Sequence, residues 1–140
     1  MHKVMVIDDE EVVRMGIRDL IDWEQEGFYI CAEGRDGRDG LEKLMEIQPD
    51  VVLVDIKMPG LSGIELIQEA RNRGFEGYFV ILTGYSEFEF AQSAIRLGVK
   101  EYLLKPIDED ELLEIMRNLL REIQKKEGEQ DYHHRNEKTA

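Results

Sequence analysis

Five short apolar runs, each followed by a segment with helical spacing, constrain the fold of this chain more than any other feature. The runs are rich in Val, Ile and Tyr, and each has the length of a buried strand. They lie at 3–7, 28–32, 51–54, 78–82 and 101–104. Because strands without a polar face need cover on both sides, the alternation predicts an α/β fold, a doubly wound five-stranded parallel sheet.

Apolar residues spaced three or four positions apart predict a helix after each strand. These helical patterns run over 13–21, 41–45, 64–70, 91–95 and 112–123. Gly27, Gly74 and Gly98 follow the first, third and fourth patterns, where a helix end favours a residue that tolerates positive φ. Pro49 follows the second pattern and is expected to stop it.

The chain has the size of one domain, with 140 residues of which 42% are apolar. From Gly128 onward the sequence has no periodicity and almost no apolar residues, so we expect it to lack a fixed structure. The predicted organisation is one domain over residues 1–126, followed by a polar tail or truncated linker over 127–140.

Charge and cysteine content narrow the classes of function. The formal net charge of -13 would repel phosphate backbones, so we expect no direct nucleic-acid binding by this domain. Cys31 is the only cysteine, which excludes an internal disulfide and suits a reducing compartment. Without an apolar run of about 18 residues or a signal segment, the chain is predicted to be soluble and cytoplasmic, with no membrane partner.

Charged and polar side chains follow most of the predicted strands at the point where each strand ends. Asp8 and Asp9 follow the first strand, Asp55 the third, Thr83 the fourth and Lys105 the fifth. In an open parallel sheet, the carboxyl ends of the strands share one edge, where ligands bind. Neighbouring carboxylates repel one another and need a cation to stay ionised. Mg²⁺, which prefers oxygen ligands, fits that demand.

Each of these residues also has a simpler interpretation when it is taken alone. Asp8 or Asp9 could cap the helix that begins near residue 10. Asp55 could open a turn, Thr83 could belong to a turn with the following glycine, and Lys105 could end a strand before a proline. These interpretations do not explain why all the residues fall on one edge of the predicted sheet.

The strand-end residues lie in four segments that resemble the receiver domain of bacterial two-component response regulators. The segments are VIDDE, DIKMPGLSG, ILTG and YLLKP, and the resemblance covers about residues 2–126. Two longer phrases, DWEQEGFYICAEG and TGYSEFEFAQSAIRLGVKEYLLKPI, are similar to receivers joined to AraC-type helix-turn-helix output domains. The resemblance implies a flavodoxin-like (βα)5 fold with the strand order 2-1-3-4-5.

The resemblance also implies a chemical role for each strand-end residue. It identifies Asp55 as the phosphoacceptor, which takes a phosphoryl group from a sensor histidine kinase. Asp8, Asp9, Asp55 and the backbone carbonyl of Lys57 would hold Mg²⁺, and Lys105 would pair with the phosphoryl group. Such a receiver promotes only its own phosphorylation and slow dephosphorylation, so it is not expected to be an enzyme for another substrate.

A conformational switch is the second implication of the resemblance. Phosphorylation adds negative charge, which would draw the Thr83 hydroxyl inward and allow Tyr102 to follow. The responding face would comprise the fourth helix, the fifth strand and the fifth helix. Phe88 and Phe90 flank this face, and at least one of them is expected to be an ordinary core residue of an amphipathic helix.

Two further details are implied near the phosphorylation site. Tyr85 lies two residues after Thr83, and we expect its ring to shield the acyl phosphate from water and so to slow hydrolysis. Receivers commonly have a cis peptide bond before the proline of the KP segment, whereas the general preference of Lys105-Pro106 is trans.

The resemblance implies a sensor histidine kinase as donor and transcription as the regulated output. No helix-turn-helix follows residue 126, so we expect a DNA-binding output domain to be missing from this chain. A homodimer formed on phosphorylation is consistent with the resemblance. The segment 122–129 is open to two interpretations, a solvated helical face or a helix that extends into a dimer or interdomain contact.

Two other classes of function are alternatives to a receiver. An aspartate-nucleophile phosphohydrolase of the haloacid dehalogenase type needs a DxD arrangement after the first strand, where this chain has DDE. A constitutive binding module would not require Asp55, Thr83 and Lys105 together. The glycine-rich segment 34–40 lacks the spacing of a phosphate-binding loop and is predicted to be a turn into the second helix.

Overall fold

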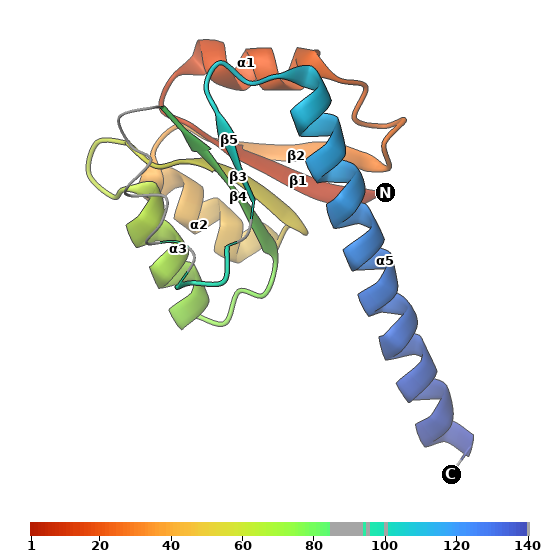
Figure 1. The fold of residues 1–140 in the computed structure, drawn as a ribbon. Coiled ribbons are helices and arrows are strands. Elements are labelled where there is room, and N and C mark those ends of the chain that lie inside the picture. The colour runs from red at the N-terminus through yellow and green to blue at the C-terminus, as the bar shows by residue number, and fades with distance from the viewer. Residues whose placement is uncertain (85–93, 95, 100, 140) are drawn as a thin grey trace.

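The computed structural model describes residues 1–84, 94, 96–99 and 101–139. Its sheet has five parallel strands in the order β2-β1-β3-β4-β5, which confirms the predicted fold and strand order (Figure 1). The strands are β1 (His2–Ile7), β2 (Phe28–Gly34), β3 (Val51–Asp55), β4 (Tyr78–Thr83) and β5 (Glu101–Leu104).

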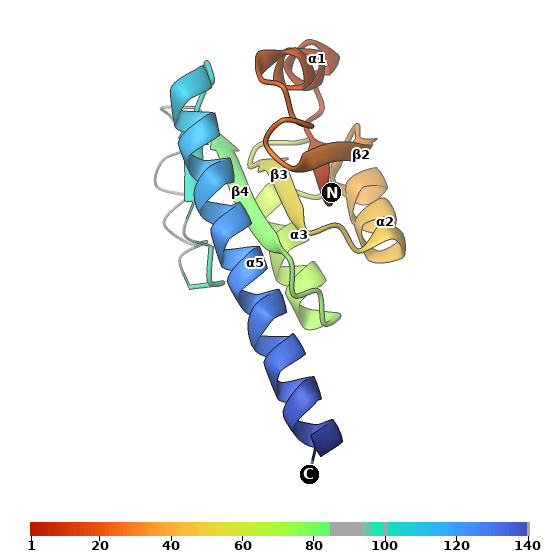
Figure 2. The ribbon, with the colours of Figure 1, turned by 90° about the vertical axis from the view of Figure 1, so that its right-hand side faces the viewer.

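Helices cover both faces of the sheet. Within the described ranges they are α1 (Glu11–Leu20), α2 (Gly37–Ile47), α3 (Gly63–Asn72) and α5 (Glu109–Thr139). Figure 2 shows α2 and α3 on one side of β3 and β4, with α5 on the other side. The predicted fourth helix lies largely outside the described residues. None of the described helices is long and apolar enough to cross a membrane.

The two sides of the sheet carry two separate apolar cores, because successive strand residues point to opposite faces. Met5, Val52 and Ile81 pack against α2 and α3. Val4, Leu53 and Val80 pack against α1 and α5. All five residues of β3 are buried, whereas the edge strands β2 and β5 are partly exposed. The central strand is therefore a rigid support for the residue at its end.

Glycines allow α2 and α3 to approach the loop after β3. A Cβ on Gly63, the first residue of α3, would lie 2.2 Å from the backbone oxygen of Asp55, and one on Gly37 would lie 2.1 Å from that of Leu61. The glycine-rich segment 34–40 leads into the second helix as predicted, but Gly34 still belongs to β2 and α2 already begins at Gly37. The Asp36 side chain accepts a hydrogen bond from the Asp39 amide and caps α2. These glycines serve close packing next to the end of β3.

The ends of α2 and α3 agree with the predicted stops, whereas the end of α1 does not. Gly27, Gly74 and Gly98 have positive φ, as expected. Gly74 directly follows the C-cap of α3, but Gly27 lies in the loop that leads into β2 and does not cap α1, which ends at Leu20. Helix α2 ends at Ile47, two residues before Pro49.

The prediction that the chain loses its structure from Gly128 is wrong for the backbone. Helix α5 continues without a break to Thr139, and its last turns project beyond the sheet in both views (Figures 1 and 2). A helix makes its hydrogen bonds within its own segment and needs no apolar face where Glu, Lys and Gln favour the conformation. The division into a domain over 1–126 and a linker over 127–140 stays a prediction.

Candidate functional site

Asp55 occupies the end of the buried central strand. Its side chain is only 4% exposed, and it lies beside Leu82 in the register of β3 and β4. The chain then leaves the sheet through Ile56, whose amide donates to the Leu82 backbone oxygen at 3.2 Å. The Asp55 carboxylate is thus held at the carboxyl edge, as predicted.

Asp8 and Asp9 follow β1 on the same edge. Asp8 is fully buried, and its amide donates to the Gly34 backbone oxygen at 3.1 Å; Asp9 is exposed. The Asp8 carboxylate also accepts a hydrogen bond of 2.9 Å from the Glu10 amide. Glu10, and neither aspartate, is the N-cap residue of α1. The interpretation of Asp8 or Asp9 as the helix cap is therefore wrong, and the bond from the Glu10 amide instead orients the Asp8 carboxylate.

The predicted acidic cluster forms at this edge. Carboxylate oxygens of Asp8, Asp9 and Asp55 all lie within 4.8 Å of one another. The Lys105 ammonium lies 2.9 Å from Oδ2 of Asp8 and 3.4 Å from Oδ2 of Asp55. A pocket of about 550 Å³ opens beside them, and Asp9, Asp55, Lys57 and Lys105 are among the residues that line it.

Burial changes the protonation of Asp55. Burial first, and then the charge of Asp8, raises the pKa of Asp55 from 3.8 to about 6, although the Lys105 ammonium partly opposes the rise. For Lys105, burial alone would lower the pKa, but the contacts with Asp8 and Asp55 outweigh burial and raise it. At neutral pH the pocket therefore holds a largely ionised Asp55 beside a charged Lys105.

The donor atoms of the cluster fit a hard divalent cation such as Mg²⁺. All the candidate ligands are oxygens, and their spacing lets one ion contact several of them. Among the described residues, the buried Oδ2 atom of Asp8 accepts no well-directed hydrogen bond, although the Lys105 ammonium is near. Lys57 lines the pocket, and its backbone N–H bonds to Asp55. Use of the Lys57 carbonyl as a ligand stays a prediction.

Thr83 precedes Gly84, which lines the pocket, and its hydroxyl points to a backbone oxygen. It ends β4, is fully buried, and its Oγ1 donates to the backbone oxygen of Gly84 at 3.0 Å. The Thr83 backbone oxygen accepts a bond of 2.8 Å from the Lys105 amide, which ties the ends of β4 and β5 together. The peptide bond between Lys105 and Pro106 is cis, the form common in receivers.

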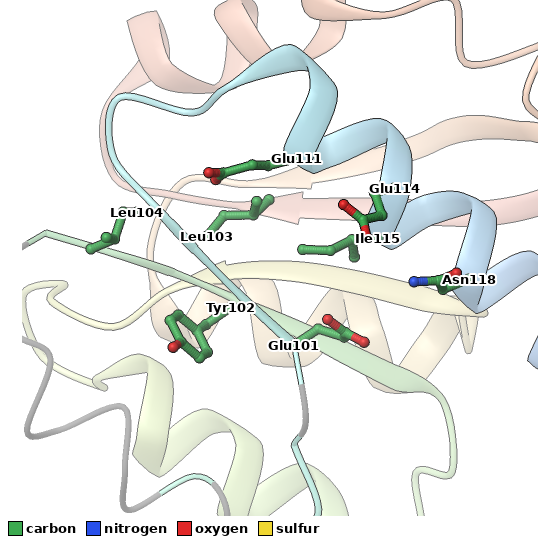
Figure 3. A pocket seen from close by; sticks show the side chains of 8 residues that line it. All are labelled: Glu101, Tyr102, Leu103, Leu104, Glu111, Glu114, Ile115 and Asn118. Carbon is green, nitrogen blue, oxygen red and sulfur yellow. The ribbon is translucent and has the colours of Figure 1, made fainter.

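Tyr102 is separated from the acidic cluster. Its side chain is 48% exposed and lies on β5, where it lines a second pocket of about 360 Å³. Figure 3 shows the Tyr102 ring beside β5, with Glu111 and Ile115 of α5 across the strand. Tyr85, Phe88 and Phe90 lie outside the described residues.

One contact with the site was not predicted from the sequence. Arg14, on α1, donates from Nη1 to the backbone oxygen of Asp8 at 2.6 Å and from Nε to Glu33 at 3.2 Å. Nothing in the sequence distinguishes Arg14 from Arg18, the other basic residue of this helix. Only the placement of α1 against the ends of β1 and β2 brings the contact about.

Comparison with curated proteins gives relatives over the whole chain. An uncharacterized transcriptional regulatory protein of Bacillus subtilis, YesN, is 35% identical over 140 residues, which are 100% of this chain and 36% of that protein. The transcriptional regulatory protein HptR of Staphylococcus aureus is 32% identical over 123 residues, 88% of this chain and 48% of that protein. This chain thus spans less than half the length of these relatives.

Solved structures share the fold. The REC domain of AraT, a response regulator from Geobacillus stearothermophilus, has a TM-score of 0.86 and 38% identity, over 90% of this chain and 98% of that chain. A two-component transcriptional regulator AraC from Clostridium phytofermentans has a TM-score of 0.79 and 26% identity, over 86% and 94%. The family model of the response regulator receiver domain matches residues 4–117. This chain therefore belongs to the response regulator receiver domain family.

Proposed function

We propose that Asp55 accepts a phosphoryl group from a sensor histidine kinase and that the resulting change controls transcription. The observation that carries this proposal is the cluster of three carboxylates within 4.8 Å, beside a pocket that Asp9, Asp55 and Lys105 help to line. Membership of the receiver family makes the chain a signalling module rather than a dedicated enzyme.

Asp55 acts as the nucleophile in the proposed reaction. One of its carboxylate oxygens attacks the phosphorus of a phosphohistidine, and the phosphorus–nitrogen bond breaks. The electron pair stays on the imidazole nitrogen, which takes up a proton, and Asp55 becomes an acyl phosphate. Burial at the end of β3 fixes the attacking oxygen, and positioning of this kind supplies much of the catalysis in phosphoryl transfer.

The surrounding residues balance the charge of the transferred group. Lys105, which contacts Asp55 and Asp8, is placed to pair with a phosphoryl oxygen. Asp8, Asp9, Asp55 and the Lys57 carbonyl would hold Mg²⁺, which neutralises phosphoryl oxygens when bound. The donor chemistry of the carboxylates supports this metal over softer ones.

The proposed switch begins at Thr83. A phosphoryl group on Asp55 would offer the Thr83 hydroxyl a charged acceptor in place of the neutral Gly84 oxygen that it now contacts. Tyr102 would follow on β5, next to the pocket formed with α5 (Figure 3). We propose this β5–α5 face as the surface that transmits the signal.

The names of the relatives support a transcriptional output. Both curated relatives are named transcriptional regulatory proteins and are longer than this chain, so we propose that a DNA-binding domain outside it carries out regulation. The proposed place of action is the cytoplasm, where such an output domain meets DNA. A phosphorylation-dependent homodimer is the assembly that we would test first.

Mass spectrometry of the intact protein tests the proposed acceptor. The wild type is incubated with acetyl phosphate and MgCl2, and we expect it to gain the mass of one phosphoryl group. Asp55→Asn, which keeps the size of the side chain but lacks the nucleophilic oxygen, should gain none. A wild type that stays unmodified, or an Asp55→Asn variant that is modified equally, would contradict the proposal. Purified kinase then replaces acetyl phosphate as the donor.

A further inference from the structure

Arg14, on α1, connects the backbone of Asp8 in the acidic cluster to Glu33 on the neighbouring strand β2. Its side chain is only 14% exposed, and the guanidinium donates to the backbone oxygen of Asp8 at 2.6 Å and to Oε1 of Glu33 at 3.2 Å. Because the guanidinium is a rigid planar fork, fixing Nε on Glu33 also fixes the direction of Nη1. Arg14 thus holds one particular backbone oxygen with a charge-assisted hydrogen bond.

That oxygen belongs to the peptide group that joins the two aspartates. The peptide is planar, so holding the Asp8 oxygen sets the orientation of the plane that leads to the Cα atom of Asp9. Asp8 has further restraints of its own, since its carboxylate is buried and contacts Lys105 and the Glu10 amide. The Asp9 side chain is exposed and has no hydrogen bond among the described residues. Its direction therefore depends on the backbone.

Glu33 anchors the arginine on the neighbouring strand. It lies near the end of β2, where it is the register partner of Val6. Its second carboxylate oxygen lies 3.2 Å from Arg18, and its backbone oxygen accepts a bond of 2.8 Å from Lys43. Glu33 is therefore held independently of Arg14 and can orient the guanidinium.

We propose that Arg14 is a positioning residue for Mg²⁺ binding, because it orients the Asp8–Asp9 peptide and thereby aims the Asp9 carboxylate at the ion. The proposal rests on the proposed function, which places Mg²⁺ among Asp8, Asp9 and Asp55. In the described structure, the Arg14 side chain forms no hydrogen bond with Asp55 or Lys105, the residues proposed to contact the phosphoryl group. Residues that orient metal ligands in this way typically change metal affinity by about 10-fold to 100-fold when they are replaced.

The loss of charge and the loss of positioning predict opposite changes in Mg²⁺ affinity when Arg14 is replaced. Removing the positive charge that contacts the Asp8 backbone would make the site more negative and would tighten the binding of a cation. Removing an orienting hydrogen bond would weaken it. Arg18 provides the matched control, since it pairs with the same Glu33 but makes no contact with Asp8 in the described structure.

Calorimetric titration of the metal-free protein with MgCl2 measures the effect without a catalytic reaction. We expect Arg14→Gln to bind Mg²⁺ about tenfold more weakly than the wild type, or weaker still. Arg14→Lys should also lose affinity, because a single ammonium cannot keep the forked geometry. Arg18→Gln should bind as tightly as the wild type or slightly more tightly. Hydrogen exchange at the Glu10 amide should quicken in Arg14→Gln and Arg14→Lys but not in Arg18→Gln.

The outcomes separate this inference from the function on which it rests. A wild type that does not bind Mg²⁺ would overturn both. If the wild type binds, an Arg14→Gln variant with equal or tighter affinity would overturn the positioning role alone. Equal losses in Arg14→Gln and Arg18→Gln would also overturn it, because they would trace the effect to the ion pairs of Glu33. Should Arg14→Gln fail to fold in circular dichroism, Arg14→Lys decides by the same criteria.

Discussion

The Lys105 ammonium lies 2.9 Å from Oδ2 of Asp8, a side chain with no exposed surface. The same nitrogen is 3.4 Å from Oδ2 of Asp55. Lys105 thus joins the proposed metal-binding side of the pocket to the phosphoacceptor side. Any cation or phosphoryl group that enters the pocket must share its charged partners with this lysine.

Replacing Lys105 by methionine should destabilise the metal-free protein, because it leaves the buried Asp8 carboxylate without its cation. We expect a loss of at most about 3 kcal/mol, the lower end for breaking a buried ion pair, since the Lys105 side chain is 24% exposed. Mg²⁺ should restore much of the loss by supplying another cation. Urea denaturation with EDTA and with MgCl2 measures both effects.

Lys57→Met is the control for this prediction. Lys57 lines the same pocket, but its side chain is exposed and forms no ion pair among the described residues. We expect its unfolding curve to match that of the wild type in EDTA. Indistinguishable curves for Lys105→Met and the wild type would show that the ion pair contributes nothing to stability.

The raised pKa of Asp55 predicts how stability depends on pH without metal. An acid whose pKa is higher in the folded state contributes stability that is complete below the unfolded pKa of 3.8 and is lost as the pH rises through about 6. At about 1.36 kcal/mol for each unit of pKa, the loss amounts to about 3 kcal/mol. The wild type should therefore lose stability relative to Asp55→Asn over this range.

Urea unfolding in EDTA at a series of pH values checks the prediction. The difference in free energy of unfolding between the two proteins should grow from about pH 4 and level off above about pH 6.5. Saturating Mg²⁺ should reduce the difference, because a bound cation stabilises the ionised carboxylate. Parallel pH profiles in EDTA would be inconsistent with a raised pKa of Asp55.

Gly63→Ala should disturb the loop that carries Asp55. The added Cβ would lie 2.2 Å from the Asp55 backbone oxygen, so the loop or α3 must shift. Overpacking of this kind costs about 1 to 3 kcal/mol, and the displaced carboxylate should slow phosphorylation by acetyl phosphate. Thermal unfolding and the rate of mass gain measure the two effects.

Gly16→Ala is the matched control for Gly63→Ala. Gly16 lies inside α1, and a Cβ there would meet nothing within 4 Å. Alanine should therefore raise stability by about 0.5 to 1 kcal/mol through its better helix propensity. An equal loss of stability in both variants would contradict the steric explanation at Gly63.

Truncation after Lys126 should leave the receiver fold intact. The residues of α5 from Gln124 to Glu129 are exposed, and Glu127 forms an ion pair of 2.8 Å with His2. A surface pair contributes about 0 to 1 kcal/mol, so the free energy of unfolding should change little. Circular dichroism should show less helix, and Mg²⁺ affinity should stay the same. A large loss of stability would place the domain boundary after residue 126.

The local pattern of the sequence was sufficient for the class of fold and for the residues at the strand ends, whereas the strand order came from the resemblance to receivers. Strand and helix periodicity depend on the order of neighbouring side chains, and a parallel sheet brings its carboxyl ends to one edge whatever the details of packing. That is why Asp8, Asp9, Asp55 and Lys105 could be predicted to meet. The extension of α5 was not predicted because residues 128–139 lack an apolar periodicity, which a helix beyond the domain does not need.

The sequence by itself determined the order of elements and which residues stand at the strand ends. Only the tertiary structure decided that Arg14 holds the Asp8 peptide, that Gly63 touches the backbone of Asp55, and that the Thr83 hydroxyl points to Gly84. The first two of these relations join segments that are distant in the chain, and the third depends on how the end of β4 is packed. Periodicity reports which face a residue occupies, whereas distances of a few ångströms between segments arise only when the helices are packed on the sheet.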